Sequence, residues 1–246
     1  MRYLINFSYD GSTFLGYQRQ KAGKTVQGEL EKVLTIIAKE KIMIHATSRT
    51  DVKVHAINQY AHFDINQKYD PDKFKYIINN LIDKDISIKN VSIVDNSFHA
   101  RYNCIKKEYI YLINVGEYNP FKNKYIYQFN KPINIIRMRK ASKLLLGKHD
   151  FRNFTTNQIE KSNCVRTILK CTIYKKGDTI KMTFVGDGFL SHMVRNIVGV
   201  LIDIGIGRKE IDYITNIFLG SEKRNSKSVL GEGLYLNKIY FNKKNR

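Results

Sequence analysis

The predicted strands and helices of this chain follow the same order twice. In the first half, the alternating apolar residues of 1–10 predict a strand, and a helical pattern begins after Thr25. Two apolar strands follow within 42–65, and Asp70-Pro71 opens a second helix before a strand at 86–94. The order β-α-β-β-α-β is the ferredoxin-like arrangement. It predicts a sheet with two helices packed against it, which restricts the fold more than any other feature.

Apolar periodicity also predicts which side chains of this half are buried. Strands place alternate residues on opposite faces, whereas helices repeat about every 3.6 residues. The strand residues expected on one face are Ile57, Ala61, Phe63 and Ile65. The helix residues expected to face inward are Phe74, Ile77, Ile78 and Leu81.

The second half approximates the same order with longer connections. A strand at 109–115 precedes a helix that Asn134 caps and Gly147 is expected to stop. A hairpin turning at Gly177-Asp178, an apolar helix and a strand at 233–241 complete the pattern.

Two such halves predict an α/β (α+β) fold with a mixed, mainly antiparallel sheet. We expect the helices on one side and a basic central cleft between two ferredoxin-like halves. The 246 residues are enough for two cores, and no low-complexity linker interrupts them. We place the first domain at 1–103 and the second at 104–246.

The charge balance indicates a polyanionic partner. Lys and Arg number 42 against 22 Asp and Glu, which gives a net charge of +20. An enzyme of small neutral substrates has no need of this charge, whereas a nucleic acid rewards it by counterion release. We therefore favour RNA or DNA binding over a merely solvated basic surface.

The cysteines and apolar runs indicate a cytoplasmic protein. Cys104, Cys164 and Cys171 form no C-x-x-C pair, and we expect reduced thiols. The longest apolar run, 197–202, is too short to span a bilayer, so we predict no membrane association.

One carboxylate stands alone in the polar loop between the two strands of 42–65. Asp51 lies two residues after Arg49 and two before Lys53. Asp in a loop usually accepts a backbone N–H in a turn, and on spacing alone that is the commoner explanation. Neighbouring cations also keep a carboxylate ionised, and therefore nucleophilic.

Sequence motifs distinguish these two explanations. They are Tyr9-Asp10-Gly11, Gly16-Tyr17-Gln18-Arg19-Gln20, Arg49-Thr50-Asp51 with Val54-His55-Ala56, Phe98-His99-Ala100-Arg101, Lys107-Glu108-Tyr109, Gly147-Lys148-His149-Asp150-Phe151 and Met193-Val194-Arg195. In this order they resemble the tRNA pseudouridine synthase A (TruA) family over essentially the whole chain.

The resemblance implies an isomerase that converts uridine to pseudouridine in the anticodon stem-loop of tRNA. It also implies a homodimer that needs no cofactor and no metal. The six histidines form no tight ligand cluster with the cysteines, and we interpret them as structural or RNA-facing. Two alternatives stay open: the same chemistry on another structured RNA, such as ribosomal RNA, and a non-catalytic RNA-binding protein.

The resemblance also assigns roles to residues. Asp51 would be the nucleophile, Arg195 its ionic partner, and Tyr109 a stacking partner of the target base that relays a proton. From the residues alone, Tyr109 is equally an ordinary strand aromatic, and Arg195 an exposed arginine that covers apolar surface.

Basic residues are candidates for RNA contact. Arg49 would hold the extruded nucleotide or its phosphate, and Lys53, Arg101 and Lys107 would contact the substrate. Further basic residues that we expect along an RNA track are Lys106, Arg137, Arg139, Lys140, Arg152 and Arg166.

Four residues depart from the family pattern. Ser48 stands where the family has Gly, Val52-Lys53 where it has Ala-Gly, and Tyr17 where Trp is usual. Because glycine adopts positive φ freely, Lys53 implies either a loop of different shape or a lysine in the left-handed conformation.

Overall fold

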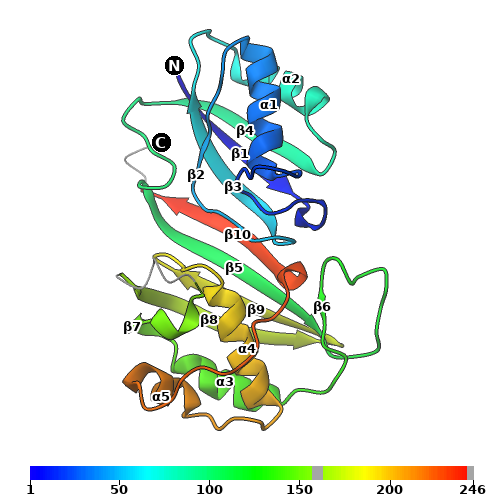
Figure 1. Cartoon of the computed structure of the whole chain (residues 1–246), viewed down its shortest axis with the longest axis vertical. Coiled ribbons are helices and arrows are strands. Elements are labelled where there is room, and N and C mark those ends of the chain that lie inside the picture. The colour runs from blue at the N-terminus through cyan, green and yellow to red at the C-terminus, as the bar shows by residue number, and fades with distance from the viewer. Residues whose placement is uncertain (157–162, 243–246) are drawn as a thin grey trace. The chain divides into compact units, whose positions relative to one another are not determined.

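The computed structural model describes residues 1–156 and 163–242 (Figure 1). Within these residues the chain forms ten β-strands and five α-helices. Contacts divide it into two compact units, residues 1–107 with 235–246 and residues 108–234. Each unit has its own strands, helices and apolar core.

The first unit is a four-stranded sheet with two helices and one short additional strand. Its elements are β1 (Arg2–Tyr9), α1 (Val26–Ala38), β2 (His45–Ala46), β3 (His55–Asp64), α2 (Pro71–Leu81), β4 (Ile86–Val94) and β10 (Leu234–Phe241). The strand order is β4-β1-β3-β10, and β2 also pairs with β3. Only β10 runs parallel to its neighbour β3, while the other pairs are antiparallel. α1 contacts α2, and α2 packs on β4.

Side-chain caps fix where both helices begin. Thr25 Oγ1 accepts a hydrogen bond from Gly28 N at 3.2 Å, and Asp70 Oδ1 accepts one from Lys73 N at 3.0 Å. Each cap satisfies a backbone donor that has no partner within the helix. The predicted starts are therefore confirmed.

A β-bulge in β3 overturns one predicted face. Phe7 pairs with Gln59, but Tyr9 pairs with Ala56, so β3 has one residue more than β1 between these pairs. The extra residue reverses the alternation, and Ile57 is 38% exposed while Ala61 and Phe63 are buried as predicted. Our placement of Ile57 on the buried face was wrong.

The last turn of α2 differs from the prediction as well. Phe74 and Ile78 are fully buried, but Leu81 is 53% exposed. The helix ends at Leu81, and Ile82 is in an extended conformation and only 8% exposed. Ile82 therefore takes the buried place that we had given to Leu81.

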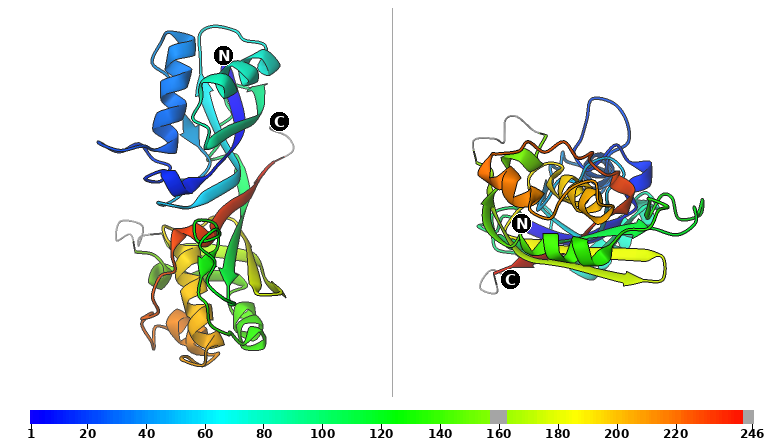
Figure 2. Two further views of the ribbon diagram at one scale, coloured as in Figure 1. Left: turned by 90° about the vertical axis from the view of Figure 1, so that its right-hand side faces the viewer. Right: turned by 90° about the horizontal axis from the view of Figure 1, so that it is seen from below.

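The second unit repeats the pattern with two additional short strands. Its elements are β5 (Cys104–Asn114), β6 (Tyr127–Gln128), α3 (Ile135–Lys143), β7 (Gly147–Asp150), β8 (Val165–Lys176), β9 (Thr179–Gly186), α4 (Met193–Gly205) and α5 (Tyr213–Leu219). The strand order is β5-β9-β8-β7, with β6 parallel to β5. Helix α3 packs against α4 and β8, and Figure 2 shows α3 and α4 as neighbours.

Two turn predictions in this unit had different outcomes. β8 and β9 form the predicted hairpin, in which Gly177 has φ +54 and Lys176 pairs with Thr179. Gly147 does not stop α3, because the helix already ends at Lys143 and Gly147 begins β7 with φ +99. The positive φ explains why this residue is a glycine. The glycine is needed at the start of a strand, however, and not at the end of a helix.

The predicted α+β fold with a mixed, mainly antiparallel sheet is confirmed. The contacts divide the chain within β5, between 107 and 108, whereas we placed the boundary between 103 and 104. They also group β10 with the first unit, because this strand pairs with β3. The expected basic cleft stays a prediction.

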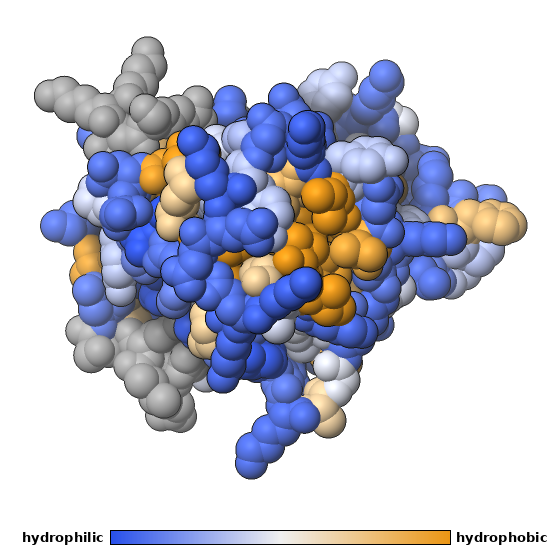
Figure 3. Space-filling view, turned by 90° about the horizontal axis from the view of Figure 1, so that it is seen from above, coloured by the Kyte–Doolittle hydropathy of each residue, from blue (hydrophilic) through white to orange (hydrophobic). Residues whose placement is uncertain are grey.

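Hydrophilic residues cover most of the face shown in Figure 3, and its largest group of apolar side chains lies near the middle of that face. Among the described residues, no helix is both long and apolar enough to cross a membrane.

Candidate active site

Asp51 lies in the loop of residues 47–54 between β2 and β3, which we call the Asp loop. Thr47 N donates a hydrogen bond to Tyr60 O at 2.9 Å, so the loop leaves the sheet from a fixed point. Val54 N donates to Asp51 O at 3.2 Å and closes a turn before β3 begins. Both ends of the Asp loop are thus tied by backbone hydrogen bonds.

The segment after β1 lies directly against the Asp loop. Tyr17 N donates to Thr50 O at 3.0 Å. A Cβ atom on Gly11 would lie 2.1 Å from Val54 O, and one on Gly16 would lie 3.0 Å from Thr50 O. Only glycine permits this approach, and Gly16 also has φ +88.

Side chains of β1 and β3 also hold the Asp loop in place by hydrogen bonds. Thr50 Oγ1 and Tyr9 Oη lie 2.7 Å apart in a buried contact. Gln59, fully buried on β3, donates from Nε2 to Ser48 O at 2.8 Å. Both contacts fix the part of the Asp loop that precedes Asp51, and neither uses its carboxylate.

Lys107 anchors the start of the Asp loop. Its Nζ donates to Thr47 O at 2.9 Å and lies 3.5 Å from Ser48 Oγ. Lys107 is also an expected RNA contact, and that role stays a prediction. The anchoring role could not be read from the sequence, because sixty residues separate Lys107 from Thr47.

Lys53 adopts the left-handed conformation, with φ +64. The second of our two expectations for this position is therefore confirmed: the loop keeps the geometry that glycine favours and strains a lysine instead. Left-handed backbone costs a residue with a Cβ atom about 1–2 kcal/mol. The side chain of Lys53 is exposed.

The surroundings of Asp51 are cationic and partly dry. Asp51 is half-buried, whereas Arg49 and Lys53 are exposed. Beside the loop, Tyr17 is 2% exposed, and within the described residues its Oη has no hydrogen-bond partner. Burial raises the pKa of Tyr17 well above its usual value, so it is a neutral phenol. We predicted no role for Tyr17, and its place in a family motif was the only signal in the sequence that pointed to it.

In the second unit, Arg195 lies in the first turn of α4. It is the one residue of this thirteen-residue helix that is not buried. Its Nε donates to Val229 O at 2.7 Å, and Val229 N donates back to Arg195 O at 3.4 Å. The segment around Val229 approaches α4 so closely that a Cβ atom on Gly199 would lie 2.0 Å from Lys227 O. Arg195 is half-buried and held, not a freely exposed arginine.

Tyr109 lies on β5 in the same unit and is only 6% exposed. Its ring meets that of Phe189 edge to face, with 5.1 Å between the ring centroids. Two residues further on, Tyr111 is fully buried and donates from Oη to Leu230 O at 2.7 Å. Tyr111 is thus a structural tyrosine, and the sequence pattern alone did not separate it from Tyr109.

Two arginines of the expected RNA track also hold the second unit together. Arg137 donates from Nε to the carbonyl oxygen of Ile204 at 3.0 Å, and so joins α3 to α4. Arg139 donates from Nε to the carbonyl oxygen of Ile173 at 2.9 Å, and so joins α3 to β8.

The structure places the site residues in both units. Asp51, Arg49 and Lys53 share one loop of the first unit, whereas Tyr109 and Arg195 belong to the second. The pairing of Asp51 with Arg195 stays a prediction. Throughout residues 1–156 and 163–242, no group of three or more His, Cys, Asp or Glu residues is arranged to hold a metal ion.

Comparisons with known proteins agree over nearly the whole chain. The family model described as tRNA pseudouridine synthase matches residues 5–103 and 141–242. A protein of Geobacillus sp. (strain WCH70) named tRNA pseudouridine synthase A is 40% identical over 243 residues, which cover 98% of each chain. A protein of the same name from Bacillus subtilis (strain 168) is 38% identical over 245 residues, covering 98% of this chain and 99% of its own.

The fold is α+β, and the Asp loop carries one half-buried carboxylate between two exposed cations. The family match and the full-length relatives show that the chain belongs to the tRNA pseudouridine synthase family. It is therefore an isomerase that acts on uridine in RNA.

Proposed function

We propose that this enzyme converts uridine to pseudouridine in the anticodon stem-loop of tRNA, with Asp51 as nucleophile. The observation that carries the proposal is the Asp loop, which holds one half-buried carboxylate between two exposed cations, Arg49 and Lys53. The names of the full-length relatives support tRNA as the substrate.

The reaction needs few groups. The glycosidic C–N bond breaks, the base turns, and a base carbon joins the ribose; that carbon loses a proton and the released nitrogen gains one. No electrons are exchanged with another molecule. One carboxylate that forms a covalent bond to the nucleotide and is later released is sufficient.

The second unit contributes the groups that act with Asp51. In the proposed site, Arg195 pairs with Asp51 and keeps the carboxylate ionised in surroundings that exclude water. The support for this role is the single partly accessible position of Arg195 on an otherwise buried helix. Tyr109 stacks on the flipped base and relays a proton, and its burial beside Phe189 gives the ring a fixed position.

Basic residues of the first unit bind the substrate. Arg49 holds the extruded nucleotide, and Lys53 and Arg101 contact phosphates; all three side chains are exposed. Lys107 is half-buried and anchors the Asp loop, so its contribution to RNA binding includes the position of that loop.

Lys53 also favours a second candidate, the same chemistry on a structured region of ribosomal RNA. Its side chain is exposed, and its backbone has the left-handed conformation that the family's glycine would favour. An added cation beside the nucleophile can change which RNA is bound. We further propose that the enzyme works in the cytoplasm as a homodimer.

Replacing Asp51 by Ala tests the proposal. We expect pseudouridine formation to fall by at least about 1000-fold, because the variant has no nucleophile. Binding of a labelled tRNA transcript should stay within about threefold of wild type across a salt titration. Asp72→Ala, which removes an exposed carboxylate on α2, is the matched control and should stay active. Pseudouridine formed by purified Asp51→Ala would refute the assignment.

Pseudouridine mapping identifies the target. Purified enzyme is incubated with bulk tRNA and ribosomal RNA from a strain that lacks its gene. New sites in the anticodon arm support the first candidate, and a new site in ribosomal RNA supports the second. Conversion of neither RNA would indicate a protein that only binds RNA.

A further inference from the structure

The face of the first sheet that lies away from the helices carries a set of aromatic rings. Phe63 of β3 packs edge to face against Phe74 of α2, with 6.1 Å between centroids. Because strand residues alternate between faces, the neighbouring His62 points to the opposite side. Ala100 N donates a hydrogen bond to His62 Nδ1 at 3.2 Å. Residues 95–103, which we call the 95–103 turn, therefore lie on the helix-free face.

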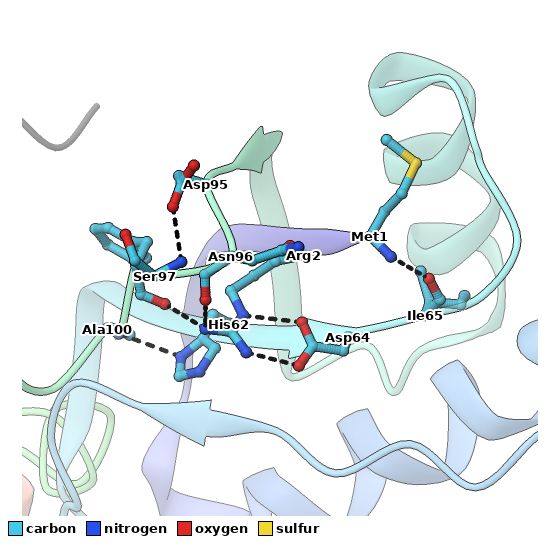
Figure 4. A network of polar contacts seen from close by, with 10 residues as sticks. Met1, Arg2, His62, Asp64, Ile65, Asp95, Asn96, Ser97 and Ala100 are labelled. Atoms are coloured by element: carbon cyan, nitrogen blue, oxygen red, sulfur yellow. Dashed lines mark hydrogen bonds and ion pairs between the residues drawn. The ribbon is translucent and has the colours of Figure 1, made fainter.

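Arg2 fastens this turn to the sheet (Figure 4). Its guanidinium pairs with Asp64 at 2.7 Å and donates to the carbonyl oxygens of Asn96 and Phe98, the latter at 2.9 Å. Within the turn, His99 N donates to Asn103 Oδ1 at 2.6 Å. The turn is thus fixed before any partner binds, which lowers the entropy cost of using it as a binding element.

Four rings form a cluster on this face. His62 is its buried member, and its ring lies 5.0 Å from that of His45 and 4.6 Å from that of His99. His45 is exposed and also lies 5.8 Å from His99, whose ring is 4.3 Å from that of Tyr102. Burial, followed by the nearby charge of His99, lowers the pKa of His62 to about 4, so its ring is uncharged near neutral pH. Tyr102 is 78% exposed and is supported by the ring of His99.

At Tyr102 the cluster adjoins a cationic residue in the same turn. Arg101 precedes Tyr102 and is exposed, and its backbone N donates to His99 Nδ1 at 3.2 Å. An exposed aromatic ring and an exposed arginine on one fixed turn suit the π-face of a nucleobase and its phosphate. An apolar protein partner would not use the arginine, and the net charge of +20 also favours RNA.

We propose that Tyr102 is a base-stacking contact for the RNA substrate outside the Asp loop, with Arg101 on the adjoining phosphate. This inference rests on the proposed function for the identity of the RNA. Tyr102 has no part in the chemistry, and it contributes to binding of the substrate alone.

The test measures binding and turnover of an unmodified tRNA transcript by Tyr102→Ala, Tyr102→Phe and Tyr76→Ala. We expect Tyr102→Ala to weaken binding about 5- to 100-fold, the range for loss of one stacked base. KM should rise by a similar factor while kcat at saturation stays within about twofold. Tyr102→Phe keeps the ring and should bind like wild type. Tyr76 on α2 is a tyrosine of comparable exposure, 70%, and its loss should change nothing.

Several results would overturn the inference. They are wild-type binding by Tyr102→Ala, an equal loss in Tyr76→Ala, and a loss explained by a lower melting temperature. A concentration-dependent mass that Tyr102→Ala abolishes would show that a second copy of the chain covers the ring. If wild type binds the transcript without forming pseudouridine, the proposed function fails, and the binding comparison still decides the role of Tyr102.

Discussion

The two groups that we propose to act together, Asp51 and Arg195, are held in different ways. Asp51 lies in a loop whose position depends on backbone hydrogen bonds and on the close approach of Gly11 and Gly16. Arg195 projects from a helix whose other residues are all buried. A shift of the Asp loop therefore disturbs mainly hydrogen bonds of the loop, whereas a shift of Arg195 disturbs the packed core of the second unit.

This difference separates activity from stability. A change that shifts the Asp loop should reduce catalysis more than folding, because catalytic geometry tolerates displacements of only about 1 Å. A change that shifts α4 should reduce both together, since tightly packed cores transmit strain.

Glycine-to-alanine substitutions give the largest expected effects. The new methyl of Gly11→Ala would lie 2.1 Å from Val54 O, and that of Gly199→Ala 2.0 Å from Lys227 O. We expect kcat of Gly11→Ala to fall at least about 100-fold, with only about 1 kcal/mol of stability lost if the loop moves away. We expect Gly199→Ala to lower the free energy of unfolding by about 2–3 kcal/mol, because the new methyl group would meet backbone packed against α4.

Urea denaturation and single-turnover kinetics measure the two quantities. Ser12→Ala, next to Gly11, brings in no new atom near the loop and is the control. Equal ratios of lost activity to lost stability in the two glycine variants would contradict the proposed difference.

Acid should weaken the first unit before the second. The pKa of His62 in the folded chain is about 4, below its ordinary value of 6.5. Between these values the unfolded chain binds a proton that the folded chain does not. The free energy of unfolding therefore falls as pH drops from about 6.5 to 4, by at most about 1.4 kcal/mol per pH unit for this residue.

Urea denaturation at pH 7 and pH 5 tests the sign. His62→Asn keeps an acceptor for Ala100 N but does not titrate, so its stability should depend less on pH than that of wild type. Limited proteolysis at pH 5 should cut within the first unit before the second. A larger acid loss in His62→Asn than in wild type would contradict the assignment.

Lys53→Gly should have the smallest effect. It relieves the strain of φ +64 but gives the unfolded chain more freedom, so we expect a gain in stability of no more than about 1 kcal/mol. The variant also lacks one cation, and the slope of log affinity for tRNA against log salt should fall by about one. An unchanged slope would show that Lys53 does not contact the RNA.

Local chemistry explains which parts of the fold were predictable. The helices that begin after Thr25, Asp70 and Asn134 each depend on a capping side chain. This side chain accepts a hydrogen bond from the backbone N of a residue three positions later, so the cap can be recognised from the local sequence. The hairpin at Gly177 depends on a glycine with positive φ between two alternating strands.

Strand pairing and the end of a helix explain the errors. Ile57 is exposed because pairing with β1 places a bulge in β3, and no residue near Ile57 specifies that bulge. Leu81 is exposed because α2 ends there, and the extended residue Ile82 is buried in its place. The first error depends on a partner in another strand, and the second on the exact residue at which the helix stops.

For the candidate site, the sequence alone determined which residue we propose as nucleophile and which charged residues flank it. Asp51 between Arg49 and Lys53 in a family motif is a property of the chain. Only the tertiary structure showed that Gly11 and Gly16 press against the Asp loop and that Lys107 anchors it. It also showed that the turn carrying Tyr102 packs its His99 against His62 of β3. These contacts join residues far apart in sequence, and their geometry is set by packing, which no local pattern encodes.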